Sequence, residues 1–146
     1  MSGANVAAMQ QEVFTGGCLC GAVRYEAAGS PADACFCHCR SCRLATGAPM
    51  VPWASFERRR FRITRGTLTE RRSSAQAWRG FCPGCGTALT YRDEGRAAQI
   101  DVTLATLDEP AAVTPRMHVW TAHRLPWVQP GDGLPQHAGS ADPGAG

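Results

Sequence analysis

Eight cysteines in the chain fall into three short groups whose spacing suits metal binding. The groups are Cys18 and Cys20, then Cys35, Cys37, Cys39 and Cys42, and finally Cys82 and Cys85. Thiolates in C-x-C or C-x-x-C spacing can reach one tetrahedral zinc ion at a Zn–S distance of about 2.3 Å. Four protein ligands close such a site, whereas three leave one position for a substrate. The sequence therefore predicts zinc chemistry, and the number of ligands separates a structural site from a catalytic one.

The first and last groups together predict a closed structural zinc site. They supply four thiolates, from Cys18, Cys20, Cys82 and Cys85. A glycine follows each pair, at positions 21 and 86, and glycine accepts the positive φ angle of a turn that directs backbone N–H groups toward sulfur. One ion held by both pairs would cross-link the first strand to the middle of the chain.

The middle group predicts a second site with three thiolates. In an extended segment Cys35, Cys37 and Cys39 point to one face, and in a row they cannot easily wrap around one ion. Cys39 and Cys42 form a C-x-x-C turn that can close around a metal already held by Cys37. Spacing alone permits several choices of three. Cys35 is then left over, either as a small buried side chain, which we expect, or as an occasional extra ligand. His38 points to the opposite face, where it would pack or support the ligands.

The rest of the chain predicts a single all-β domain. Its 16 glycines and 10 prolines favour many turns, and apolar and polar residues alternate over short runs between them. The predicted strands are 22–26, 51–56, 61–65, 87–91, 99–104 and 117–120. Helical turns are expected only at 41–46 and 107–111. Two tryptophans near the end of the chain, Trp120 and Trp127, are expected in the core.

Charge and composition exclude several classes of partner. A net charge of +3 is too small to indicate a nucleic-acid-binding protein, although all fifteen basic residues are arginine. No signal peptide precedes the first strand, and no apolar run approaches the ~20 residues of a membrane span. In a reducing compartment such cysteines are metal ligands rather than disulfides. We therefore expect a cytoplasmic protein that does not enter the membrane.

Three motifs together resemble one family. They are GCLCGAVRY at 17–25, CHCRSCR at 37–43 and FCPGCGT at 81–87, followed by HVW at 118–120, LPWV at 125–128 and GLPQ at 133–136. The combination closely resembles the glutathione-dependent formaldehyde-activating enzymes, a family that also includes centromere protein V. The resemblance covers residues 13–137, nearly the whole chain.

The resemblance implies a fold, two metal ions and a domain boundary. The implied fold is a β-tent of coiled antiparallel sheets over residues 13–138. The composition of the two ends separately predicts flexible tails at 1–12 and 139–146. The implied ligands are Cys18, Cys20, Cys82 and Cys85 for a structural zinc. For a catalytic zinc they are Cys37, Cys39 and Cys42. Cys35 is not among the family's usual ligands.

The predicted activity is that of a carbon–sulfur lyase. Three thiolates give a Zn²⁺ site a formal charge of −1, so binding a substrate thiol is more natural there than making hydroxide. The family's reaction joins glutathione, as co-substrate, to formaldehyde and yields S-hydroxymethylglutathione. The partners would be a small thiol and an aldehyde, and Arg40 and Arg43 beside the ligands are candidate contacts for the thiol substrate.

Two other functions remain open at this point. A non-catalytic zinc module could bind a protein or a nucleic acid, although a purely structural site would normally have a fourth ligand. The third alternative is zinc storage or redox sensing through Cys35 and its neighbours. The sequence does not name the physiological thiol or aldehyde, and it does not reveal the oligomeric state.

Overall fold

The computed structural model describes residues 12–141, which form two β-sheets, one α-helix and five short 3₁₀ turns. The strands are β1 (Val13–Gly17), β2 (Arg24–Ala28), β3 (Asp33–Cys37), β4 (Val51–Glu57), β5 (Phe61–Arg65), β6 (Thr69–Arg72), β7 (Ala77–Phe81), β8 (Ala88–Asp93), β9 (Gln99–Thr103) and β10 (His118–Val119). The helix is α2 (Arg40–Thr46). The 3₁₀ turns are η1 (Arg58–Arg60), η2 (Glu94–Arg96), η3 (Leu104–Thr106), η4 (Pro110–Ala112) and η5 (Thr121–His123).

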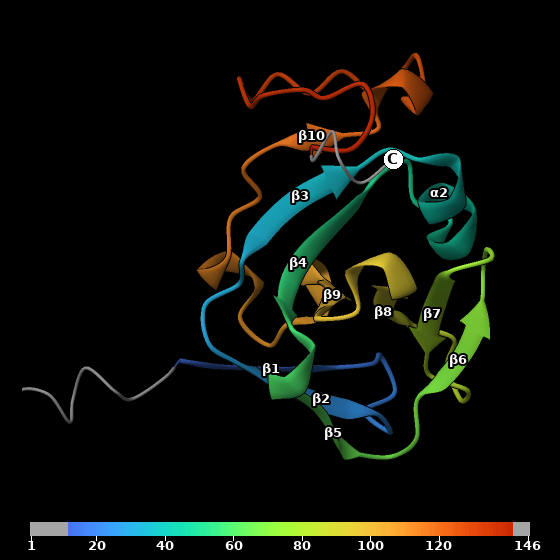
Figure 1. Ribbon diagram of the computed structural model, residues 1–146, viewed down its shortest axis with the longest axis vertical. Helices are drawn as coiled ribbons and strands as arrows, with labels where there is room; N and C mark the ends of the chain where they lie inside the picture. The colour runs from blue at the N-terminus through green and yellow to red at the C-terminus, as the bar shows by residue number, and fades with distance from the viewer. Residues whose placement is uncertain (1–11, 142–146) are drawn as a thin grey trace, which may run out of the picture.

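The two sheets differ in size and share no strand. The smaller has the order β1-β2-β5 and is antiparallel, and the larger has the order β10-β3-β4-β9-β8-β7-β6. Only β10 is parallel to its neighbour, β3. Figure 1 shows the small sheet at the base, with α2 at the upper right between the end of β3 and the start of β4. The chain is thus mostly β, as predicted.

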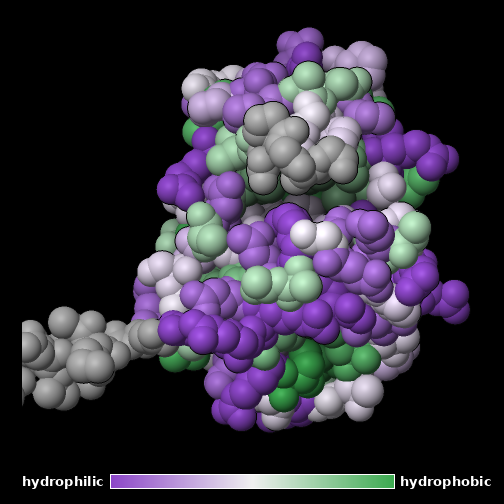
Figure 2. Space-filling model, viewed as in Figure 1, coloured by the Kyte–Doolittle hydropathy of each residue, from purple (hydrophilic) through white to green (hydrophobic). Residues whose placement is uncertain are grey.

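The main core lies between the small sheet and one face of the large sheet. Alternate residues of β2 and β4 enter it, among them Tyr25, Ala27, Ala54 and Phe56, which are all almost fully buried. The opposite face of the large sheet carries a second cluster around Cys37, Cys42, Val51, Trp53 and Val119. Because β4 contributes to both clusters, it is buried on both faces. The surface view in Figure 2 is largely hydrophilic, with an apolar patch at the base where β2 and β5 lie.

Most of the predicted elements are present with small shifts at their ends. The strand at 61–65 has the predicted bounds, and the helical turn at 41–46 is α2. The turn at 107–111 is displaced, because Leu107 is buried after η3 and η4 begins at Pro110. β1, β3, β6 and β7 were not predicted as strands. The tails at 1–12 and 139–146 fall mainly outside the described residues.

The prediction that both tryptophans lie in the core is wrong. Trp127 is 70% exposed and Trp120 is 37% exposed. Trp120 has a φ of 56°, in the left-handed region, and its ring meets the ring of His123 edge-on. The segment after β10 crosses the outside of the sheet edge, so its large apolar side chains have no second layer to cover them. No helix among residues 12–141 has the length and hydropathy needed to span a lipid bilayer.

Candidate metal centres

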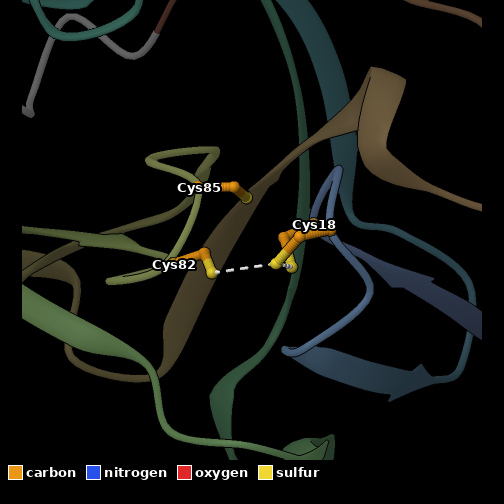
Figure 3. Close-up of side chains that lie close together, drawn as sticks. Cys18, Cys82 and Cys85 are labelled. Atoms are coloured by element: carbon orange, nitrogen blue, oxygen red, sulfur yellow. Dashed lines mark hydrogen bonds between the residues drawn. The ribbon is translucent and has the colours of Figure 1, made fainter.

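The structure brings the first and last cysteine pairs together into what we call the four-cysteine group. Cys18 and Cys20 follow β1, Cys82 and Cys85 follow β7, and the four sulfurs all lie within 4.8 Å of one another. Figure 3 shows Cys82 and Cys85 on one loop facing Cys18 on the other. The Sγ atom of Cys20 is 3.6 Å from that of Cys18 and 3.8 Å from that of Cys82. Ligands of a tetrahedral zinc ion with 2.3 Å bonds are about 3.8 Å apart, so the group fits this ion.

Both loops of the four-cysteine group are shaped by the glycine that follows the second cysteine. Gly21 has a φ of 78° and Gly86 a φ of 80°, the left-handed conformation expected from the sequence. The Gly21 N–H donates to the carbonyl of Cys18 at 3.1 Å, and the Gly86 N–H donates to the carbonyl of Cys82 at 2.8 Å. Each pair of thiols is therefore held by a closed backbone turn before any ion binds.

Thr87 connects the two loops. Its Oγ1 accepts a hydrogen bond from the Leu19 N–H at 3.0 Å and lies 3.2 Å from the Sγ of Cys85. Since the oxygen already accepts, its own proton is free to be donated to the sulfur. This hydrogen bond is the main reason why the pKa of Cys85 falls to about 5. In the other loop the Val23 N–H donates to the Sγ of Cys18, which lowers that pKa as well. Both contacts favour the thiolate form that a metal requires.

The second assembly, the three-cysteine group, lies at the junction of β3 and α2. Cys37 ends β3, Cys39 is the N-cap of α2, and Cys42 lies in the first turn, where its N–H donates to the Sγ of Cys39 at 3.3 Å. Their sulfurs also lie within 4.8 Å of one another. Among residues 12–141, no fourth histidine, cysteine or carboxylate joins the set. The donor set suits zinc, and each of the two groups can hold a metal ion.

The thiols of the three-cysteine group are close enough to compete for protons. Hydrogen bonds from Cys37 and then Cys42 hold the pKa of Cys39 far below its usual range. The same contact with Cys39 raises the pKa of Cys37, which keeps its proton. Without an ion Cys39 is therefore the first of the three to lose its proton, and a bound cation would release the remaining protons. Cys35 stays outside the group, and burial raises its pKa to about 12.

Most of the chain matches one known protein family. Residues 13–123 match the family described as glutathione-dependent formaldehyde-activating enzymes. The chain belongs to this family. Its structure is also similar to the crystal structure of a Rhodobacter sphaeroides protein from a structural genomics programme. The TM-score is 0.55 at 26% sequence identity, and the match covers 84% of this chain and 98% of that chain. No curated protein matches the chain significantly.

In this member of the family, Arg79 contacts the three-cysteine group. The sequence analysis did not identify this residue as part of the site. Both Nη atoms of Arg79, on β7, lie 3.7 Å from the Sγ of Cys42. The guanidinium also stacks over the ring of Tyr91 at 5.0 Å, and its Nε donates to the Oγ of Ser73 at 3.2 Å. β7 was not predicted as a strand, so nothing in the sequence indicated which face Arg79 occupies.

The two arginines predicted as substrate contacts lie on α2. Arg40 is exposed, and Arg43 is half-buried with its Nε enclosed. Within the described part of the chain neither guanidinium has a hydrogen-bond or ion-pair partner. Both therefore stay candidates for binding a substrate group, but it is Arg79 that touches a sulfur.

His38 supports the three-cysteine group from the side facing β10. The ring is fully buried, and its Nε2 lies 2.8 Å from the Nδ1 of His118, whose Nε2 lies 2.8 Å from the Oδ2 of Asp132. The His38 N–H also donates to the carbonyl of Val119. With the Asp132 carboxylate as acceptor, both imidazoles donate through Nε2 when neutral, and the buried Nδ1 of His38 has no partner among the described residues. The line of rings fixes the segment between Cys37 and Cys39.

A cavity of about 340 Å³ lies beside the four-cysteine group rather than the three-cysteine group. It is lined by the end of α2, the start of β4 and the loop from Cys85 to Ala88. Its lining contains no charged side chain and none of Cys37, Cys39 and Cys42. The cavity therefore offers no cation to a thiol that carries carboxylates. The three-cysteine group, and not this cavity, is the better candidate for binding such a thiol.

Proposed function

We propose that this protein is a zinc-dependent carbon–sulfur lyase that forms or breaks the adduct of a thiol and an aldehyde. The observation that carries the proposal is the contrast in ligand number between the two groups. One brings four sulfurs together, and the other brings three sulfurs and no further ligand from the described residues. A three-ligand centre is typical of a catalytic zinc, because a substrate can complete the coordination.

In this proposal the two groups have different roles. Cys18, Cys20, Cys82 and Cys85 would hold a structural zinc that joins β1 to β7, within a β-tent domain over residues 13–138. Cys37, Cys39 and Cys42 would hold the catalytic zinc. The chain's own contribution is to fix these three sulfurs by the end of a strand and the cap of a helix, and to exclude water around the buried Cys37 and Cys42.

The bound zinc would supply one chemical step, deprotonation of a thiol that coordinates it. Such a thiolate would attack an aldehyde carbonyl, and in the reverse direction it would leave from the hemithioacetal carbon as the carbonyl re-forms. The proton lost by the thiol appears on the hydroxyl of the adduct, so the reaction needs no oxidant or reductant. The family description names glutathione and formaldehyde, and we propose this pair, or a related one, as substrates.

Exchange NMR with glutathione and ¹³C-formaldehyde tests this function directly. The zinc-loaded protein should speed the exchange between free glutathione and S-hydroxymethylglutathione. Cys42→Ser should abolish the acceleration, whereas the matched variant Cys35→Ser should retain it, because Cys35 lies outside the group. Related thiol and aldehyde pairs would be screened in the same way. If no pair exchanges faster with protein than without it, the protein is a zinc-binding module and not a lyase.

A further inference from the structure

The contact between Arg79 and Cys42 is the starting point. Both terminal nitrogens of the guanidinium point at one sulfur, each at 3.7 Å. A planar guanidinium can present two parallel N–H groups in this way, and a lysine ammonium cannot. Hydrogen bonds to a ligating sulfur withdraw electron density from it and so tune the bound metal.

Unlike Arg92 and Arg96, Arg79 has no carboxylate partner among residues 12–141. Arg92 pairs with Glu70 at 2.6 Å and Arg96 pairs with Asp101 at 3.0 Å. Arg79 is instead held in place by Ser73 and the face of Tyr91, both neutral. Its positive charge is thus half-buried and directed at the Cys42 sulfur, which becomes its counter-charge when that thiol is ionised.

The charge balance of the three-cysteine group explains why such a residue is useful. Three thiolates and one Zn²⁺ carry a net charge of −1, and a substrate thiolate would raise it to −2. Bringing like charges together in a half-buried place is costly unless a cation lies close by. Arg79 supplies that cation at a ligand sulfur, so the centre and the guanidinium together are neutral before the substrate binds.

We infer that Arg79 is a positioning residue that makes the three-cysteine group able to accept an additional anionic sulfur. It acts through Cys42, by holding that sulfur with two N–H groups and offsetting its charge. A thiol that completed the set would lose its S–H proton to water, and Arg79 would offset the charge of the sulfur thus added. The inference rests on the proposed function, since it assumes that the additional ligand is a substrate thiol.

Cobalt-substituted protein gives a readout that does not depend on turnover. The Co²⁺ protein would be titrated with glutathione and with 2-mercaptoethanol, and binding followed by the sulfur-to-cobalt charge-transfer absorption. The variants are Arg79→Gln, Arg79→Lys and the control Arg71→Gln. Arg71 lies directly opposite Arg79 on β6, is exposed and makes no contact with sulfur. The control Arg71→Gln therefore removes an equal charge from a neighbouring position.

We expect Arg79→Gln to weaken thiol binding about 10- to 100-fold, the effect of losing hydrogen bonds to a charged group. Arg79→Lys should fall between it and the wild type, because the charge stays and the two-pronged contact is lost. Arg71→Gln should change binding by less than about twofold, as expected for an exposed charge. Even without added thiol, the charge-transfer band of Arg79→Gln should move to lower energy, because the Cys42 sulfur loses its two N–H donors.

Three outcomes would overturn the inference. Thiol affinity and the charge-transfer band could be unchanged in Arg79→Gln, or Arg71→Gln could weaken binding as much, which would show a general charge effect. In both cases the proposed function would stand. If thiols do not alter the spectrum of the wild type, the proposed function fails and the inference fails with it. Should Arg79→Gln not fold, Ser73→Ala removes the Nε anchor instead and should give a smaller loss of thiol affinity.

Discussion

The two cysteine groups of this chain use the same ligand atom and are built in different ways. The four-cysteine group lies on two loops, each closed by a glycine turn, and a threonine hydroxyl joins the loops. The three-cysteine group lies where a strand passes into a helix, with an arginine against one sulfur and a buried histidine between two ligands. The first arrangement satisfies its sulfurs with neutral donors, and the second adds a charge. Neutral donors suit a structural metal site, and an added positive charge suits a site that would bind an anionic substrate.

The largest contrast is expected in stability. Cys85→Ser should lower the free energy of unfolding by more than about 4 kcal/mol, because a structural zinc contributes directly to folding. Cys42→Ser should lower it by less than about 2 kcal/mol, since α2 is short and lies at the edge of the fold. Thermal unfolding, with the zinc content of each variant, measures both. Equal losses in the two variants would mean that both groups are structural.

Thr87→Val tests whether the hydroxyl bridge matters to the four-cysteine group. The variant keeps the shape of the side chain but leaves the Leu19 N–H without its acceptor and Cys85 without its donor. We expect a 10- to 100-fold loss of zinc affinity at this group, the usual effect of removing a partner of a metal ligand. Competition with a chromophoric chelator measures the loss. Thr106→Val is a matched control on another element. An equal loss of zinc affinity in this control would show that the hydroxyl of Thr87 has no special role at the four-cysteine group.

Acid sensitivity should come partly from Asp108, which joins the small sheet to the loop after β9. Arg24 and Thr15 both donate to its carboxylate, and they lower its pKa from 3.8 to about 2. Its stabilisation is therefore complete above pH 3.8 and is lost as the pH falls toward 2. Asp108→Asn should cost about 1 kcal/mol at neutral pH, after allowance for exposure to solvent, and the cost should disappear as the pH falls through about 2. Urea unfolding at several pH values checks this, and a constant difference down to pH 2 would contradict it.

The smallest effect is expected at Cys35. Its pKa of about 12 keeps the thiol neutral, and it lies outside both groups. Cys35→Ala should leave the zinc content unchanged and cost about 1 kcal/mol or less from lost packing beside Trp53. Metal analysis and thermal unfolding measure these quantities. Loss of one zinc ion in this variant would show that Cys35 is a ligand.

The sequence predicted the cysteine groups better than their surroundings. Ligand spacing is local, so the pairs at Cys18 and Cys82 could be recognised from a few residues each. Arg79 reaches Cys42 only because β7 lies in the same sheet as β3, and pairing between distant strands leaves no trace in the spacing. Trp120 and Trp127 were misplaced for a similar reason. Their hydrophobicity predicts burial, but burial also requires a layer above them, which only the fold determines.

The line of His38, His118 and Asp132 also has a consequence for the order in which the protein is completed during synthesis. Cys85 is the last member of the four-cysteine group to be synthesised, and it leaves the ribosome well before the end of the chain. The neighbours of the three-cysteine group come from β10 and the segment that follows it, near the end of the chain. The four-cysteine group can therefore be assembled before the three-cysteine group acquires its supports.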